Sequence, residues 1–251
     1  MTLHLSRLTL KRDPGTDALR ELIDPKAHGR AVDAHHRLVW SVFADGAERA
    51  RDFLWRAEER GRFYVLSKRL PVSSPLFEPP ETKPFEVALA PGDRLRFTLR
   101  ANAVASLPGA PLGDGRHARG RKIDVAMKAL HAVPARDAAS PASRVLSSAH
   151  QPSARAEVRE RIARDEALAW LARQGRAHGF EPDGDAFRLF GHRTVALPGH
   201  RGKRRGEPRF GVFDMAGELG VTDTDAFLTA LGDGFGRAKA FGCGLMLIRR
   251  V

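Results

Sequence analysis

The chain has 251 residues, with 42 Lys and Arg against 30 Asp and Glu, and a formal net charge of +12 at pH 7. This excess of positive charge favours a polyanionic partner, nucleic acid before membrane, because no basic amphipathic helix stands out. The single cysteine, Cys243, excludes an intrachain disulfide framework and a cysteine-rich zinc site. The sequence has neither a signal-peptide core nor a run of membrane-spanning length, which predicts a soluble, cytoplasmic protein.

The N-terminal half predicts strands around one amphipathic helix. Alternating apolar residues favour strands, whereas apolar residues at helical spacing favour the helix. In the last of these strands, arginines occupy the face opposite Leu95, Phe97 and Leu99. The order is typical of a ferredoxin-like α+β sandwich. The expected elements are strands at 2–10, 85–89 and 93–101, a helix at 31–43, and a hairpin at 51–57 and 62–69.

The C-terminal half predicts a second unit of the same kind. Residues 108–122 read as a basic Gly/Pro linker, and residues 133–154 as a poorly ordered insertion. The expected elements are helices at 154–177 and 222–231, and strands at 186–197, 209–215 and 245–248. Thr222 and Thr224 are candidate N-caps of the second helix. We therefore expect an α+β protein of two tandem ferredoxin-like (RRM-like) domains with antiparallel sheets, divided into residues 1–112 and 113–251.

Two adjacent histidines in the helix at 31–43 are candidates for proton transfer, because histidine titrates nearest neutral pH. His35 falls in the middle of the apolar face, which favours a core histidine with a backbone partner. His36 lies at the border of that face, beside Trp40 one turn later and Asp33 one turn earlier. A border residue is held by packing and still reaches a substrate, so His36 is the better candidate.

Five glycines near the C-terminus surround Arg237 and Lys239. Such a loop, with Gly234 and Gly236 at its start, lets backbone amides approach a phosphate closely. A helix C-cap followed by a tight turn needs glycine equally. Spacing does not separate these two readings, and the pattern fits neither a Walker loop nor a dinucleotide fingerprint.

Two basic segments are candidate nucleic-acid contacts, although charge runs are also common in solvated loops. One lies in the expected linker and the other at the expected tip of a hairpin between the strands at 186–197 and 209–215. Their candidate RNA-binding residues are Arg116, Arg119, Arg121 and Lys122 in the first segment, and Arg201, Lys203, Arg204 and Arg205 in the second.

The chain resembles the CasE family, the CRISPR precursor-RNA endoribonucleases of the type I-E Cascade complex. The resemblance rests on the strand at 3–10 and on the motifs His36-Arg-Leu-Val-Trp40-Ser-Val-Phe43, Arg51-Asp-Phe-Leu, Leu70-Pro-Val-Ser, Leu99-Arg-Ala-Asn102 and Gly234-Phe-Gly236-Arg-Ala-Lys239-Ala-Phe-Gly-Cys-Gly-Leu245. It implies a tandem ferredoxin-like fold that binds the stem-loop of each CRISPR repeat and cuts once at its 3′ base. It further implies that the protein stays on its product as a subunit of Cascade.

The resemblance also implies a chemistry without metal or other cofactor, in which the ribose 2′-hydroxyl attacks the adjacent phosphate. The products are a 2′,3′-cyclic phosphate and a 5′-hydroxyl. The family histidine corresponds to His36, as base or as acid. Lys239, Arg237, or a residue near Lys26 and Arg30 is expected to stabilise the pentacoordinate phosphate.

One position departs from the family pattern and keeps an alternative open. Relatives often have tyrosine three residues before this histidine, where this chain has Asp33. The carboxylate either orients His36 or repels the scissile phosphate. A stem-loop-binding protein that does not cut is therefore the alternative. An RNA-chaperone RRM protein is disfavoured because its exposed aromatic pattern is missing, and a DNA-binding regulator because no helix-turn-helix is evident.

Overall fold

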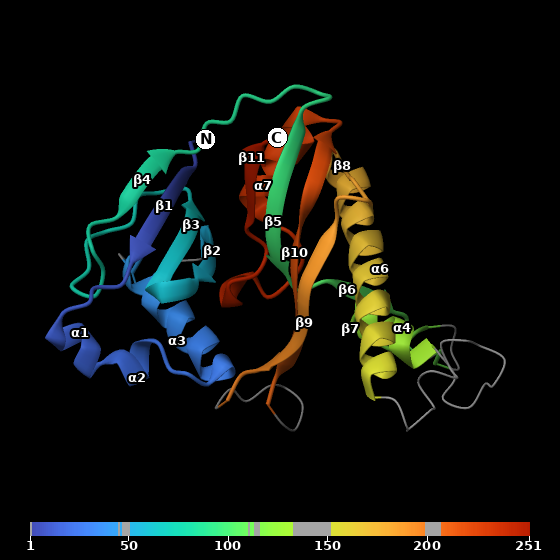
Figure 1. Cartoon of the computed structure of the whole chain (residues 1–251), viewed down its shortest axis with the longest axis horizontal. Coiled ribbons are helices and arrows are strands. Elements are labelled where there is room, and N and C mark those ends of the chain that lie inside the picture. The colour runs from blue at the N-terminus through green and yellow to red at the C-terminus, as the bar shows by residue number, and fades with distance from the viewer. Residues whose placement is uncertain are drawn as a thin grey trace.

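The computed structural model describes residues 2–44, 46, 51–109, 111–112, 116–132, 152–198 and 207–251, with the backbone alone at 131–132 and 152–158. Its first sheet is antiparallel, with four strands in the order β2-β3-β1-β4 (Figure 1). The bounds are β1 His4–Thr9, β2 Phe53–Glu58, β3 Arg62–Ser67 and β4 Glu81–Pro84. The predicted hairpin is confirmed, and its strands are joined by the 3-10 turn η1, Glu59–Gly61.

Helix α3, His28–Ser41, covers one face of the first sheet and follows two short helices, α1 (Pro14–Ala18) and α2 (Arg20–Ile23). Its Leu38 and Val39 are buried against Phe63 and Val65 of β3. This apolar contact is the one that the helical spacing of the sequence predicts. The helix holds the candidate histidines on a packed scaffold.

The second sheet has the order β11-β5-β10-β8, and β9 pairs with the first part of the long β10. Helices α6 and α7 cover one of its faces, and their apolar residues share a core with Leu95, Phe97 and Leu99 of β5. The bounds are β5 Arg94–Ala101, α6 Pro152–His178, β8 Phe180–Pro182, β9 Arg188–Ala196, β10 Arg209–Val221, α7 Thr224–Asp233 and β11 Met246–Arg250. None of the helices in the described ranges is long and apolar enough to cross a membrane.

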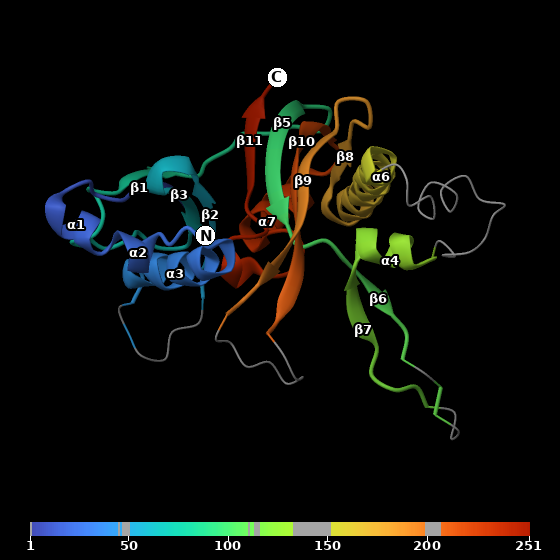
Figure 2. The same ribbon diagram turned by 60° about the horizontal axis from the view of Figure 1, so that its bottom comes forward.

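A small hairpin of β6 (Val104–Leu107) and β7 (Arg121–Asp124) extends away from the second sheet and leads into α4, Val125–Ala132 (Figure 2). The sequence predicted a linker over 108–122 and no helix at 125–132. The short strands escaped prediction because they pair only with each other and need no buried alternation.

The sheets divide the chain differently from the predicted boundary at residue 112. The strand expected at 93–101 forms, but it pairs with β10 and β11 in the second sheet rather than with the N-terminal strands. No strand occupies 85–89, because the first sheet is completed by β4 at Glu81–Pro84. Strand pairing between distant segments is not encoded in local alternation, so the order of elements suggested the wrong partner.

The N-cap of α7 differs from the expected one, and most of the expected insertion is not tested. Asp223, rather than Thr222 or Thr224, caps α7, since its carboxylate accepts a hydrogen bond from the amide of Ala226 at 3.0 Å. The insertion expected at 133–154 lies outside the described residues from 133 to 151, and residues 152–154 begin α6.

The two sheets are joined by an apolar contact on the face of the first sheet opposite α3. Leu54 and Leu66 of that face are buried against Leu245, with Tyr64 and Leu247 packed around them. The C-terminal segment, which follows the glycine loop, thus lies at the junction of the two halves.

Candidate functional site

His36 lies where helix α3 meets the C-terminal loop. Its ring is half-buried, 5.4 Å from the ring of Phe241 between centroids and 6.4 Å from that of Trp40. Phe241 belongs to a 3-10 turn, η2, Lys239–Phe241, and also stacks on Phe210 of β10 at 5.8 Å. Packing from both halves therefore sets the position of the imidazole, as the border position of His36 predicted.

The adjacent His35 has a different role. Its Nε2 lies 2.9 Å from Oδ1 of Asp24, and its ring makes an edge contact with Phe63 at 5.0 Å. Burial lowers the pKa of His35, and Asp24 opposes this shift. His35 is a core histidine as predicted, but its partner is a carboxylate from the α2–α3 turn and not a backbone group.

The glycine loop is folded tightly onto both halves of the protein. Gly234 is the C-cap of α7, where its amide donates to the carbonyl of Ala230 at 2.8 Å. A Cβ on Gly234 would come within 2.7 Å of Leu54, and one on Gly236 within 2.8 Å of the carbonyl oxygen of Asn102. Both glycines have positive φ. Close packing and the C-cap therefore account for Gly234 and Gly236 without a bound phosphate.

Lys239 lies in η2, two residues before the ring that contacts His36. Its amine donates to the carbonyl oxygen of Asp233 at 2.7 Å. Burial lowers the pKa of Lys239, and the charge of Arg51 lowers it further. An ammonium group has three N–H donors, so the bond to Asp233 leaves two for a ligand.

Arg237 precedes this turn and points its charge to solvent. Its main-chain amide donates to the carbonyl oxygen of Asn102 at 3.2 Å, while its side chain is exposed. Asn102 is itself buried and donates through Nδ2 to the carbonyl of Gly211 at 2.7 Å. The Leu99-Arg-Ala-Asn102 segment thus anchors the loop from the second sheet.

Asp33 is buried, 8% exposed, and forms an ion pair with Arg37 one turn later in α3. The guanidinium is largely exposed and compensates the carboxylate charge on the helix that carries His36. Tyr64 packs in the apolar contact on the opposite face of the first sheet from α3. It therefore does not take the place of a tyrosine at position 33.

The structure brings together a charged cluster that sequence reasoning missed. Asp214 of β10 accepts from Arg100 at 2.6 Å and also pairs with Arg193 of β9. Arg193 Nε lies 3.2 Å from Nε2 of His28 at the start of α3, and Arg100 donates to the carbonyl of Ala57 at 3.1 Å. Burial acts to raise the pKa of Asp214, but both guanidiniums lower it, and the net shift is downward. No local spacing predicts the cluster, since its members come from four different elements, β5, β9, β10 and α3.

A cavity of about 90 Å³ lies beside this cluster, between α3 and the second sheet. Its lining includes His35, Trp55, Phe241 and Cys243. Burial raises the pKa of the Cys243 thiol to about 12. The single cysteine therefore stays a protonated apolar group at neutral pH. Among the described side chains, no group of three or more His, Cys, Asp and Glu gathers as a metal site.

The first basic segment falls on the β6–β7 hairpin. Arg116, Arg119, Arg121 and Lys122 are all exposed, and the Lys122 amine bonds to the Ser106 hydroxyl across the hairpin. They lie on an element separate from η2 and α3 (Figure 2). The second segment, with Arg201, Lys203, Arg204 and Arg205, lies outside the described residues, although β9 and β10 pair on either side of it as expected.

Comparison with known proteins places these features in a family context. The family model described as CRISPR associated protein matches residues 3–250. The CRISPR system Cascade subunit CasE of Escherichia coli K12 is 31% identical over 94 residues, which are 36% of this chain and 47% of that protein. The match thus spans about half the length of that curated relative.

Solved structures match along almost the whole chain. Thermus thermophilus Cse3, solved bound to an RNA representing a pre-cleavage complex, has a TM-score of 0.62 and 22% identity and covers 99% of this chain and 100% of its own. Cas6e from Escherichia coli K-12 has a TM-score of 0.51 and 19% identity, with 99% and 100% coverage. At these identities the likeness concerns the fold, and the predicted α+β class with antiparallel ferredoxin-like sheets is confirmed.

Proposed function

This chain belongs to the CRISPR associated protein family, and we propose that it is an endoribonuclease that processes CRISPR repeat RNA. The motif resemblance to CasE is confirmed by the family match and the curated relative. On this proposal the protein binds the stem-loop of the repeat, cuts at the 3′ base of the stem without a metal ion, and remains bound as a Cascade subunit. The named activities of its relatives support the assignment, since one is called a Cascade subunit and another was solved with a pre-cleavage RNA.

The observation that carries the proposal is the packing of His36 against Phe241. A general acid or base must be held within hydrogen-bond reach of the proton that it moves. Here α3 supplies the imidazole and η2 supplies the ring on which it rests, so the two halves of the molecule position one side chain. An RNA lying across the junction would meet that side chain.

The proposed reaction is a transesterification. The 2′-hydroxyl loses its proton, its oxygen forms a bond to the adjacent phosphorus, and the bond from phosphorus to the 5′-oxygen breaks. The leaving 5′-oxygen takes up a proton. His36 is proposed to move one of these two protons, and the products are a 2′,3′-cyclic phosphate and a 5′-hydroxyl.

Lys239 is the proposed stabiliser of the pentacoordinate phosphate, through the donors that its bond to Asp233 leaves unused. Arg237 is proposed to contact a neighbouring phosphate, because its exposed side chain is anchored through the main chain to Asn102. The exposed arginines and the lysine of the β6–β7 hairpin are proposed to track the backbone of the stem, which A-form RNA presents along its grooves. RNA binding stays a prediction from the sequence for Arg201, Lys203, Arg204, Arg205, Gly234 and Gly236.

A second candidate is a subunit that binds the stem-loop without cutting it, and Asp33 in the position of the family tyrosine favours it. The ion pair with Arg37 weakens this alternative, because a compensated carboxylate repels a phosphate less than an isolated one. The cyclic phosphate in the product separates the two candidates.

The test is cleavage of cognate repeat RNA in the presence of EDTA by the wild type, His36→Ala and the control His35→Gln, with binding measured alongside. His35→Gln keeps a hydrogen-bonding group beside Asp24. We expect His36→Ala to bind normally and to cut at least about 100-fold more slowly. Wild-type binding without a 2′,3′-cyclic product would establish the non-cleaving subunit instead.

A further inference from the structure

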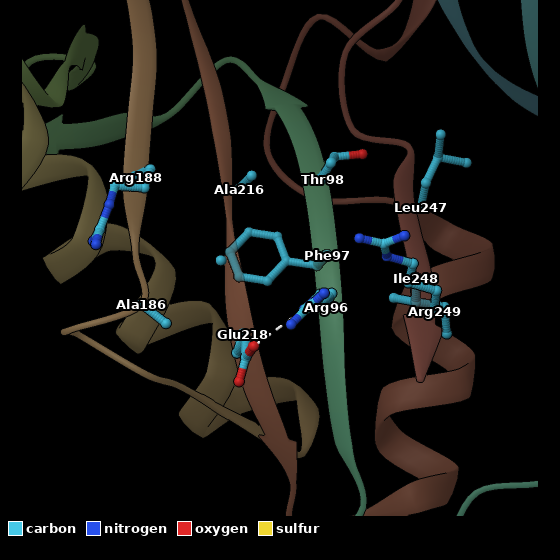
Figure 3. Close-up of a pocket in the computed structure, with 11 residues that line it drawn as sticks. Arg96, Phe97, Thr98, Ala186, Arg188, Ala216, Glu218, Leu247, Ile248 and Arg249 are labelled. Carbon is cyan, nitrogen blue, oxygen red and sulfur yellow. Dashed lines mark hydrogen bonds and ion pairs between the residues drawn. The ribbon is translucent and has the colours of Figure 1, made fainter. Parts of the chain in front are cut away.

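The face of the second sheet opposite α6 and α7 carries a hollow of about 480 Å³ (Figure 3). Apart from Ala186, which lies in the turn before β9, its lining residues belong to β5, β9, β10 and β11, so the hollow is built mainly on paired strands. It shares no lining residue with the cavity beside His35 and Phe241. None of His36, Arg237 and Lys239 lines the hollow, so it is distinct from the proposed cleavage site.

The strand register explains why the surface is hollow here. Thr98 pairs with Leu247 on one side and with Ala216 on the other, and Ala216 pairs with Arg188. The two short side chains, Thr98 and Ala216, form a low floor. In the next row of the same face, Arg96 pairs with Arg249 and Glu218, whose long side chains rise beside that floor.

The charge around the floor is positive. Glu218 is the acidic side chain of the lining, and it forms ion pairs with Arg96 at 3.2 Å and with Arg94 at 3.1 Å. Arg188 donates to the main-chain oxygens of Asp185 and Phe187 at 2.5 and 2.8 Å and forms no ion pair with a carboxylate among the described residues. Arg249 is exposed and has no acidic partner in the part of the chain that the structure describes.

An exposed aromatic side chain lies in the same strand as Arg188. Phe190 is 75% exposed and is the additional residue of a β-bulge, because Leu189 pairs with Met215 while Gly191 pairs with Asp214. Arginines combined with an exposed aromatic ring are the elements with which proteins hold single-stranded nucleic acid, since an unpaired base is free to stack.

We propose that this hollow is a second RNA-binding site, which takes the phosphates of a single-stranded segment flanking the stem-loop. The proposal rests on the proposed function, because it presupposes an RNA substrate. Arg188 and Arg249 contact the phosphates from opposite sides of the floor formed by Thr98 and Ala216. The segment lies on the sheet face, while the stem is held by the β6–β7 hairpin and the junction.

The test measures fluorescence anisotropy with a labelled oligouridylate of about ten nucleotides, which has no stem, and separately with the repeat stem-loop. The test variant is Arg188→Glu with Arg249→Glu. The matched control is Arg173→Glu with Arg176→Glu, which makes the same charge change at exposed positions of α6, on the covered face of the sheet. An oligoglutamate peptide serves as the probe for an acidic protein partner.

We expect the test variant to bind oligouridylate about tenfold more weakly than the wild type. The slope of the logarithm of the binding constant against the logarithm of the salt concentration should fall in magnitude by about 1.4, as for two lost phosphate contacts. The control variant should bind as the wild type does, and all proteins should bind the stem-loop similarly. Equal oligouridylate binding by test and control variants overturns the proposal. Binding of oligoglutamate but not oligouridylate overturns it in favour of an acidic protein. Failure to bind or cut the stem-loop would instead count against the proposed function.

Discussion

The indole Nε1 of Trp55 donates a hydrogen bond to the carbonyl oxygen of Ala240 at 3.1 Å. Trp55 belongs to the first sheet, and Ala240 lies in η2 between Lys239 and Phe241. One hydrogen bond therefore ties the N-terminal half to the turn that supports His36 and carries the proposed phosphate-stabilising lysine.

Replacing Trp55 with Phe tests this link. The substitution removes the donor, leaves the carbonyl of Ala240 without it, and should lower the free energy of unfolding by about 1–3 kcal/mol. We expect cleavage to slow more than RNA binding weakens, because η2 loses a hydrogen bond that holds it in position, while the β6–β7 hairpin is unchanged. Urea unfolding, cleavage rates and stem-loop affinity measure the three effects. Equal losses of cleavage and binding would contradict a positioning role.

Replacing Gly242 with Ala tests the same contact from the other side. Gly242 has φ +77°, and a Cβ there would lie 3.1 Å from the ring of Trp55. We expect a loss of stability of about 2 kcal/mol or more, from left-handed strain and crowding together. Gly92→Ala is the control, since its φ is +94° and nothing lies within 4 Å of the added methyl group. Thermal unfolding that ranks Gly92→Ala as the more damaging change would refute this account.

The buried His35 predicts a dependence of stability on pH. Burial lowers the pKa of His35 below the ordinary value of 6.5 in the folded protein. As the pH falls below 6.5, His35 is protonated in the unfolded chain before it is protonated in the folded chain, so the free energy of unfolding decreases. The loss continues until the pH passes the lower folded pKa. Urea unfolding across this range should give a shallower decline for His35→Gln, and an unchanged slope would exclude His35 as the source.

The ion pair between Asp33 and Arg37 predicts a rescue experiment. Arg37→Ala removes the guanidinium charge beside the Asp33 carboxylate, which we expect to slow cleavage about fivefold, for an added unfavourable interaction with the phosphate of about 1 kcal/mol. Asp33→Asn in the same chain should restore the rate. Single-turnover cleavage of the repeat RNA measures both variants. If the double variant is as slow as Arg37→Ala, the carboxylate does not act on the phosphate.

Local patterns predicted the elements around the site well. The spacing of Leu38 and Val39 identified a helix, expected at 31–43 and found at 28–41, and the border position of His36, because burial of one helical face imposes that spacing. The hairpin expected at 51–57 and 62–69 followed from the β-rich composition of the two segments, and its strands are found at 53–58 and 62–67. The spacing left two interpretations of Gly234 open, a phosphate loop and a helix C-cap. The close approach of Leu54 and the hydrogen bond from the Gly234 amide to the carbonyl of Ala230 support the C-cap.

Long-range pairing decided the rest. The strand at 94–101 was recognised as a strand, yet its place beside β10 and β11 depended on partners more than 100 residues away along the chain. Together with the pairing of β9 and β10, this pairing gathers Arg100, Arg193 and Asp214, and it sets Arg188 and Arg249 on either side of a low floor. Arg100 is 114 residues from Asp214, so no local pattern predicts that they are neighbours.

The sequence by itself determined the family, the class of fold and the basic character, and it is the source of the prediction that His36 rather than His35 transfers the proton. These properties depend on motifs, on composition and on which side of a single helix is apolar. Only the tertiary structure decided the sheet to which Arg94–Ala101 belongs, the carboxylate partner of His35 and the attachment of the C-terminal turn to Trp55. The first and last of these depend on the free energy of packing between segments that are remote in the chain, and the His35 partner depends on how the α2–α3 turn folds back on α3. Local periodicity carries no information about either.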